Sequence, residues 1–277
     1  MSETKFALST RVVLITGATS GIGRACAELL ASSGWRVFGT GRSLSSALPP
    51  AGHVEMVEMD VDDDASVHAG VATVIAKAGR LDAVINNAGF SMRGAVEDTA
   101  IVEAKAIFET NFFGVLRVCR AVMPALRANG GGYIVNISSL AGVVGLPFSG
   151  LYSASKFALE GVSESLRLET RPFGIHVVLV EPGDFRTQIT VNRHLAAPSQ
   201  KSVYRAAFYE FMDKRGQNEA AAPTPEPVAR LVEHILNHHS PKMRYSVGRL
   251  GQRILVQLKR LLPQRVFEWL FCHAMGL

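Results

Sequence analysis

The chain of 277 residues is long enough for one large α/β domain or two smaller ones, and its 48% hydrophobic content is sufficient for a sizeable core. That composition excludes a largely disordered chain. The three cysteines, Cys26, Cys119 and Cys272, lie far apart and give neither a disulfide framework nor a zinc-binding pattern, so a reducing cytoplasm is the expected compartment.

The net charge of +5 is concentrated near the carboxyl end. Residues 241–277 contain seven Lys or Arg residues and one acid, a charge of +6, whereas the other 240 residues contain 22 basic and 23 acidic groups, a charge of −1. The main body therefore lacks a basic face, and no nucleic-acid partner is expected. The amino terminus does not read as a secretion signal, and no apolar stretch is long enough to span a bilayer.

Strands and helices are predicted to alternate along the chain. Short apolar runs typical of buried parallel strands occur at 11–16, 36–40, 54–59, 81–85, 132–137 and 175–180, with 243–247 as a candidate last strand. Helical stretches are predicted at 24–33, 67–78, 103–127, 152–170 and 228–237. This alternation predicts an α/β fold with a single doubly wound parallel sheet, helices on both faces and ligands at the carboxyl ends of the strands.

A glycine-rich turn, Gly17-Ala18-Thr19-Ser20-Gly21-Ile22-Gly23, separates the first strand from the first helix. Without Cβ atoms in the way, backbone N–H groups and the helix dipole can face a pyrophosphate. The Gly-x3-Gly-x-Gly spacing departs from the commoner Gly-x-Gly-x-x-Gly, and alone it is equally consistent with a plain tight turn.

The second strand ends at Arg42 and has no acidic residue there. In dinucleotide-binding folds an acid at this place binds the ribose hydroxyls of NAD, whereas an arginine suits the 2′-phosphate of NADP. The sequence therefore favours NADP(H). The alternative is a solvated loop arginine.

Further polar motifs follow the next two strands. Asp60 and Val61 come directly after the third strand, and the acids at 62–64 are expected to cap and begin the following helix. The run Asn86-Asn87-Ala88-Gly89 follows the fourth strand. Asn111 lies within a mostly apolar helix, where a buried amide needs partners and is usually structural.

Tyr152 and Lys156 are four residues apart in a predicted helix, so both side chains leave from one face. A neighbouring ammonium favours the phenolate, which makes Tyr152 a candidate general acid/base. Ser139, at the end of the fifth strand, is a candidate to hold a carbonyl or hydroxyl oxygen. A lone Tyr–Lys pair is more often a surface pair; the cofactor motifs in the same chain favour the catalytic interpretation.

Residues 184–222 break the alternation and contain five aromatic residues. This predicts an irregular segment that folds over the site as a lid. The eight histidines show no ligand spacing with carboxylates, and no metal site is expected.

In combination these motifs resemble those of the short-chain dehydrogenase/reductases, in order over about residues 10–250. The matching residues are Thr16 to Gly23, Asn86-Asn87-Ala88-Gly89, Asn111, Ile137-Ser138-Ser139, Tyr152-x-x-x-Lys156 and Pro182-Gly183. The resemblance implies a Rossmann-type oxidoreductase. The stretch from Gly142 to Gly161 looks most like the branch with 17β-hydroxysteroid and retinol dehydrogenases.

The resemblance also implies roles for individual residues. Ser139 polarises the substrate oxygen and Tyr152 exchanges the proton; Lys156 contacts the nicotinamide ribose and lowers the tyrosine pKa; Asn111 holds a water in a proton relay. The implied cofactor contacts are Gly17, Thr19, Ser20, Gly21, Ile22 and Gly23 at the pyrophosphate, Asp60 and Val61 at the adenine, Asn87 with Ala88 and Gly89 along the adenosine half, and Pro182, Gly183 and Thr187 toward the carboxamide.

The expected activity is an NADP(H)-dependent interconversion of a ketone or aldehyde and an alcohol on an apolar, lipid-, steroid- or retinoid-like substrate. Candidate wall residues are Leu140, Val143, Leu146, Phe148 and the aromatics of 184–222. One alternative is a catalytically silent NADP(H)-binding sensor or scaffold, against which the intact Ser139, Tyr152 and Lys156 argue. Another is a membrane-surface scaffold that acts through the basic tail, which need not exclude enzymatic activity. The resemblance further implies a homodimer or homotetramer that pairs through the helices holding Asn111 and Tyr152.

Residues 248–277 form a basic tail after the catalytic domain predicted over 1–247. On a helical wheel six apolar residues fall within an arc of about 140°, with basic residues on the other side: Leu250, Ile254, Leu255, Leu258, Leu261 and Leu262, against Arg249, Arg253, Lys259 and Arg260. Pro263 then precedes an aromatic segment. This pattern suits peripheral contact with an anionic membrane. The alternatives are a tail that packs on its own domain, roofs the pocket or forms a subunit interface.

Overall fold

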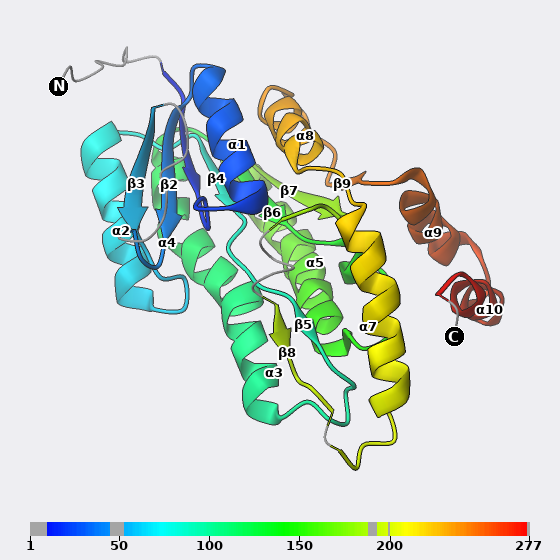
Figure 1. Cartoon of the computed structure of the whole chain (residues 1–277). Helices are drawn as coiled ribbons and strands as arrows, with labels where there is room; N and C mark the ends of the chain where they lie inside the picture. Colours follow the sequence, from blue (N-terminus) through cyan, green and yellow to red (C-terminus); the bar gives the residue numbers. More distant parts are fainter. Residues whose placement is uncertain (1–9, 45–52, 188–192, 199, 276–277) are drawn as a thin grey trace.

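The computed structural model describes residues 10–44, 53–187, 193–198 and 200–275 (Figure 1). Parts of the predicted units lie outside the described residues. These are 1–9 and 45–52 of the predicted domain 1–247, 188–192 and 199 of its lid segment 184–222, and 276–277 of the tail 248–277.

Seven parallel strands form one sheet in the order β3-β2-β1-β4-β6-β7-β9 (Figure 1). Their bounds are β1 Val12–Ile15, β2 Arg36–Gly41, β3 Val54–Glu58, β4 Ala83–Asn86, β6 Gly132–Ile137, β7 Ile175–Pro182 and β9 Arg244–Val247. Each predicted strand, including the candidate last one, occurs here within a few residues. The prediction of a single doubly wound parallel sheet is confirmed.

Helices cover both faces of the sheet because its strands are apolar on both sides. All four residues of β1 are at most 2% exposed. Val13 and Ile15 face the layer of α1 (Gly21–Ser32) and α8 (Glu226–Leu236). Val12 and Leu14 face the opposite layer, which consists of α2 (Asp64–Ala78), α4 (Gly114–Ala128) and α5 (Gly150–Thr170).

The acidic run after β3 caps α2, as predicted. The Asp63 carboxylate accepts a hydrogen bond from the Ser66 backbone N–H at 2.8 Å, and Asp64 lies in the first turn, where its charge complements the helix dipole.

The helix predicted over 103–127 is divided. It consists of α3 (Ile101–Phe108), a π-helical turn η1 (Glu109–Phe113) and α4. The wider turn inserts Asn111 into the core, and π-helical turns of this kind are frequent at functional sites. The apolar periodicity alone did not indicate the extra residue in this turn.

The segment 184–222 is less irregular than predicted. Its described residues include a short strand β8 (His194–Leu195), which pairs in parallel with β5 (Met92–Arg93), and a long helix α7 (Arg205–Ala220). Among the described side chains of α7, the buried apolar ones are Phe208 and Phe211, which pack against Phe148 with ring centroids 5.7 and 5.3 Å away. Because so few apolar side chains of α7 are buried, the sequence shows no apolar repeat at the helical period here.

The tail forms two helices, α9 (Leu250–Leu261) and α10 (Gln264–Met275), at one end of the molecule (Figure 1). Val256, Phe267 and Phe271 pack with Val144 of the sheet domain in a separate apolar cluster. The tail therefore packs on its own domain, one of the alternatives given by the sequence. No helix in the described ranges is long and apolar enough to cross a bilayer.

The orientation of α9 differs from the predicted apolar arc. Gln252 donates to the Asp184 carboxylate and Lys259 to the Val143 carbonyl, so these polar residues lie on the inner side of the helix. Leu255, Leu258 and Leu262 of the predicted arc also pack on the inner side. At 100° per residue the six positions Gln252, Leu255, Val256, Leu258, Lys259 and Leu262 are centred about 90° from the predicted arc. Val256 is consequently 1% exposed, whereas Leu250 and Leu261 of the arc are 68% and 79% exposed.

Candidate active site

The glycine-rich turn between β1 and α1 has a backbone that only glycine accommodates readily. Gly17 and Gly21 have φ angles of 65° and 56°, in the left-handed region. A Cβ on Gly23 would lie 2.4 Å from the Gly17 carbonyl oxygen and 2.4 Å from the Asn87 amide nitrogen. The turn is thus held closed by close backbone contact.

Asn87 and Thr16 fix this turn to the end of β4. The Asn87 amide donates to the carbonyls of Thr16 and Gly17 at 2.9 and 3.1 Å, and the Thr16 hydroxyl accepts from the backbone N–H groups of Asn87 and Ala88, both at 2.9 Å. The Asn87 side chain therefore positions the turn.

The amino terminus of α1 is suited to an anion. Ser20 at the N-cap makes no side-chain cap and the first turn contains no acid, so the end of the helix dipole is not neutralised by the chain itself. An adjoining cavity is lined by predicted cofactor residues: Gly17, Thr19, Ser20, Gly21, Ile22, Arg42, Asp60, Val61, Asn87, Ala88, Gly89 and Thr187. Gly23 lies behind the turn. These residues fit a nicotinamide dinucleotide.

Ser139 and Tyr152 meet at the end of β6. Ser139 precedes the short helix η2 (Leu140–Gly142), and its hydroxyl accepts from the Ala141 backbone N–H at 3.1 Å. The same hydroxyl lies near enough to the Tyr152 phenol, which projects from the first turn of α5, to influence its pKa. Ser138, the neighbouring serine, is buried. Of the two neighbouring serines, Ser139 is therefore the one beside the Tyr152 phenol.

Burial raises the pKa of Tyr152, and the hydrogen bond from Ser139 and the charges of Arg93 and Arg215 lower it in part. The Lys156 ammonium points to the end of β6. That Lys156 lowers the tyrosine pKa stays a prediction.

Lys156 is itself buried. Its ammonium donates to the Ile137 carbonyl at 2.9 Å, and burial lowers its pKa to about 8, with Glu160 opposing that change. The side chain still lines the same cavity as Tyr152, as expected for residues four apart on α5.

Asn111 is fully buried, and its amide is used by protein groups. Its oxygen accepts from the Phe90 backbone N–H at 3.0 Å, and its nitrogen donates to the Phe90 carbonyl at 3.0 Å and to the Ser155 hydroxyl at 3.3 Å. The side chain thus joins the loop after β4 to α5. Its participation in a proton relay stays a prediction.

A second cavity extends from Tyr152 toward the tail and is continuous with the cofactor cavity through Ile22, Asn87, Gly89 and Thr187. Pro182 and Gly183 at the end of β7 line it, as predicted. Its apolar wall residues are Leu140, Val144, Leu146, Phe185, Leu255, Val256 and Phe271. The tail therefore roofs this pocket. Of the other predicted wall residues, Val143 packs against the tail and Phe148 packs against α7.

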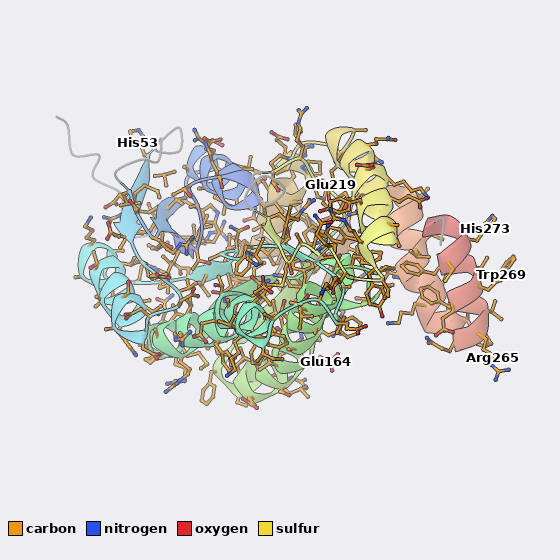
Figure 2. All side chains as sticks on the ribbon, turned by 60° about the horizontal axis from the view of Figure 1, so that its bottom comes forward. His53, Glu164, Glu219, Arg265, Trp269 and His273 are labelled. Carbon is orange, nitrogen blue, oxygen red and sulfur yellow. The ribbon has the colours of Figure 1, made fainter. Side chains whose placement is uncertain are left out.

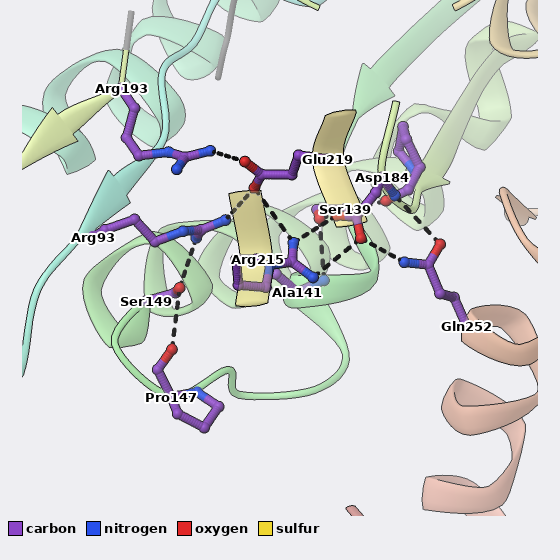
Figure 3. Close-up of polar contacts among 11 residues, drawn as sticks. Arg93, Ser139, Ala141, Pro147, Ser149, Asp184, Arg193, Arg215, Glu219 and Gln252 are labelled. Carbon is purple, nitrogen blue, oxygen red and sulfur yellow. Dashed lines mark hydrogen bonds and ion pairs between the residues drawn. The ribbon is translucent and has the colours of Figure 1, made fainter. Parts of the chain in front are cut away.

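Sequence reasoning did not identify the charged side of this pocket. Arg93, Asp184, Arg193, Arg215 and Glu219 line it as a buried group of ion pairs (Figure 3). Arg215 and Glu219 are four residues apart on α7, a spacing that ordinarily indicates a surface pair.

Comparison with known proteins agrees with this arrangement. A family model described as short chain dehydrogenase matches residues 11–197. A 3-ketodihydrosphingosine reductase of Bacteroides thetaiotaomicron is 39% identical over 263 residues, which cover 95% of this chain and 97% of the relative.

Solved structures are similar over nearly the whole chain. A short-chain dehydrogenase from Streptomyces avermitilis has 34% identity and a TM-score of 0.76 and covers 91% of this chain and 93% of its own. A short chain dehydrogenase/reductase from Burkholderia phymatum, in complex with NAD, has 25% identity and a TM-score of 0.75. The match covers 93% of this chain and 95% of the Burkholderia chain. The chain is an oxidoreductase that belongs to the short-chain dehydrogenase/reductase family.

Proposed function

We propose that the protein is an NADP(H)-dependent reductase or dehydrogenase that interconverts a carbonyl group and an alcohol on a long, largely apolar substrate. The observation that carries this proposal is the neighbouring pair Ser139 and Tyr152, located where the glycine-rich cavity joins a pocket roofed by α9 and α10. The name of the Bacteroides relative, a reductase of a lipid ketone, agrees with a substrate of this kind.

In this proposal the two hydroxyls hold the substrate oxygen between them. Ser139, whose own oxygen is fixed by the Ala141 N–H, orients that oxygen, and Tyr152 transfers the proton to or from it. When bound, the nicotinamide supplies or accepts the hydride. Because burial raises the Tyr152 pKa, the phenol keeps its proton at neutral pH and is suited to donate it in the reducing direction.

The preference for NADP(H) rests on Arg42. This side chain is exposed at the end of β2 and lines the cofactor cavity close to Asp62, whose pKa it lowers in part. A guanidinium at this place suits a 2′-phosphate. A related chain of known structure binds NAD, so the cofactor choice needs a direct comparison of the two.

The test is a turnover assay with NADPH and NADH against long-chain ketones and aldehydes of graded length, with Tyr152→Phe as the control. Consumption of NADPH that depends on substrate and is lost in the variant supports the proposal. If the protein binds NADPH but turns over no carbonyl compound in the series, the silent sensor or scaffold becomes the better account.

We also propose that the outer side of the tail docks on an anionic lipid surface. Leu250, Ile254, Leu261, Val266 and Trp269 are exposed there. Figure 2 shows Arg265, Trp269 and His273 directed away from the body of the molecule. Apolar and basic side chains on one outward face are suited to the interface of a negatively charged bilayer. Such docking would place the roofed pocket next to the phase in which an apolar substrate dissolves.

This proposal is tested by co-sedimentation with liposomes that contain anionic or only neutral lipid, at low and high salt. The double variant Leu261→Ser/Trp269→Ser removes two exposed apolar groups without touching the pocket, and Ile101→Ser/Val102→Ser is the matched control on α3. We expect binding to anionic liposomes at low salt that only the first variant loses. A parent protein that stays in the supernatant contradicts the proposal.

The proposed assembly is a homodimer or homotetramer paired through η1, α4 and α5. Phe113 on η1 and Phe157 and Leu168 on α5 are exposed, and apolar groups of this kind are buried in stable subunit interfaces. Light scattering of the parent and of Leu168→Asp tests this pairing. A monomeric parent would contradict it.

A further inference from the structure

Five charged side chains gather on one side of the substrate pocket (Figure 3). Arg93, Arg193 and Arg215 have 6%, 8% and 13% of their side-chain surface exposed, and Glu219 and Asp184 have 9% and 16%. They come from β5, from the two ends of the segment after β7 and from α7. Burial of five charges next to an apolar wall is costly unless each charge has partners, so the partners of each group decide what the cluster can bind.

Both carboxylates are fully engaged by the chain. The Glu219 carboxylate accepts a hydrogen bond from the Arg193 guanidinium at 2.6 Å. Its oxygens also lie 3.6 Å from a nitrogen of Arg93 and 3.7 Å from a nitrogen of Arg215. The Asp184 carboxylate accepts hydrogen bonds from both terminal nitrogens of Arg215, at 2.6 and 3.0 Å, and from the Gln252 amide at 2.7 Å. A cationic ligand would have to displace a guanidinium from one of them.

The arginines, by contrast, have donors left over. Three guanidiniums against two carboxylates leave a charge of +1, and the buried Nε atoms of Arg93, Arg193 and Arg215 have no hydrogen-bond partner among the described residues. Burial, together with the charges of Arg193 and Arg215, lowers the pKa of Arg93 to about 10, so the three cations repel one another. A guanidinium has only donors, so the missing partner is an acceptor.

The charged cluster lies beside the reacting groups. Arg93, Asp184 and Arg215 are near enough to influence the Tyr152 phenol, and Arg93 is held in place by a 2.6 Å hydrogen bond to the Ser149 hydroxyl just before α5. The opposite wall of the pocket is apolar and is formed partly by the tail. A ligand that satisfies both sides has a charged head close to its carbonyl group and an apolar chain under the roof.

We propose that this cluster binds an oxyanion, a carboxylate or a phosphate, at the head of an amphipathic carbonyl substrate. The proposal rests on the proposed function, since it names the substrate class of the same pocket. Arginine is suited to both anions because its fork of N–H donors matches their oxygens. Asp184 and Glu219 hold the arginines in position and reduce the repulsion among the three guanidiniums when no ligand is bound.

Binding of dodecanoate, dodecyl phosphate, dodecanamide and dodecyltrimethylammonium is measured by calorimetry below their micelle concentrations, with and without NADPH. We expect one or both anions to bind at least about ten-fold more tightly than the neutral amide, and the ammonium more weakly still. Comparison of the two anions distinguishes a carboxylate from a phosphate site. Equal affinity for all heads, or preference for the ammonium, overturns the proposal.

Two variants with opposite charge changes separate recognition from general damage. Arg193→Gln takes the cluster from +1 to 0 and lowers the ratio of anion to amide affinity. Glu219→Gln takes it to +2 and raises the ratio. The double variant restores +1 and the parental preference. A ratio that moves in the same direction in both single variants reports lost packing and overturns charge recognition.

Turnover of the matching keto compounds is measured in parallel. Anion preference in binding without any turnover leaves this inference standing and rejects the proposed function. Turnover of the keto compounds without a difference between the carboxylate and the amide leaves the proposed function standing and rejects the inference.

Discussion

Replacement of Lys156 by methionine is expected to abolish turnover but to stabilise the fold at neutral pH. The buried ammonium has a pKa of about 8 in place of its ordinary 10.5. A difference of about 2.5 in pKa corresponds to about 3 kcal/mol, by which the native state is destabilised when the lysine is protonated in both states. Lys156→Met removes this penalty, but it also loses the hydrogen bond to the Ile137 carbonyl, which offsets about 1 kcal/mol of the stability gained.

The pH dependence of this gain has a definite sign. Below pH 8 the lysine is protonated in both states and the whole penalty applies. Between pH 8 and 10.5 the unfolded chain holds a proton that the native state has lost, so the stability of the parent rises with pH. Lys156→Met lacks this group. Its advantage is about 2 kcal/mol at pH 7 and close to zero at pH 10.

Urea unfolding followed by tryptophan fluorescence, at fixed protein concentration, measures both quantities. Lys105→Met on α3 is the matched control, because Lys105 is exposed. We expect no comparable difference between pH 7 and pH 10 for this control. A Lys156→Met protein that is less stable than the parent at pH 7, or whose advantage is the same at both pH values, would refute the reasoning that burial of the ammonium is costly.

The remaining predictions concern the cofactor and the proton. Tyr152→Phe removes the proton donor but keeps the ring, so turnover is lost while NADPH affinity, followed by fluorescence titration, stays within a few-fold of the parent. Arg42→Ala raises the Michaelis constant for NADPH about ten-fold and leaves that for NADH nearly unchanged; an equal effect on both shows that Arg42 does not bind the phosphate. Gly23→Ala places a Cβ 2.4 Å from the Gly17 carbonyl and weakens NADPH binding and lowers Tm, whereas Gly216→Ala on α7 meets nothing within 4 Å and does neither.

The sheet and the catalytic motifs followed from the sequence for one physical reason. Buried parallel strands are continuous apolar runs, and the residues after each run lie at the same edge of the sheet. Thr16, Asn87, Ser139 and Gly183 are far apart in the chain, but each follows such a strand. Their convergence was therefore predictable without knowledge of any side-chain contact.

The charged cluster was not predictable in this way. Arg93 and Glu219 are 126 residues apart, on a two-residue strand and on a helix with little apolar periodicity, and neither element has a strong local signal. The inner side of α9 likewise includes two polar residues, Gln252 and Lys259, whose contacts with Asp184 and Val143 the apolar periodicity did not indicate. Tertiary contacts of this kind decide which face of an element is buried.

The roof over the pocket consists of α9 and α10, which follow the sheet domain in the chain, and this order has a consequence for synthesis in the cell. Domains begin to fold from the amino terminus while the chain is still being made, so the sheet, Ser139, Tyr152 and the glycine-rich turn exist before α9 and α10 do. Until α10 arrives, Val144 and the neighbouring wall lie open to water. A chain that ends prematurely near residue 247 would be a nearly complete oxidoreductase with an uncovered apolar trough, and we expect quality control to recognise it by self-association rather than by unfolding.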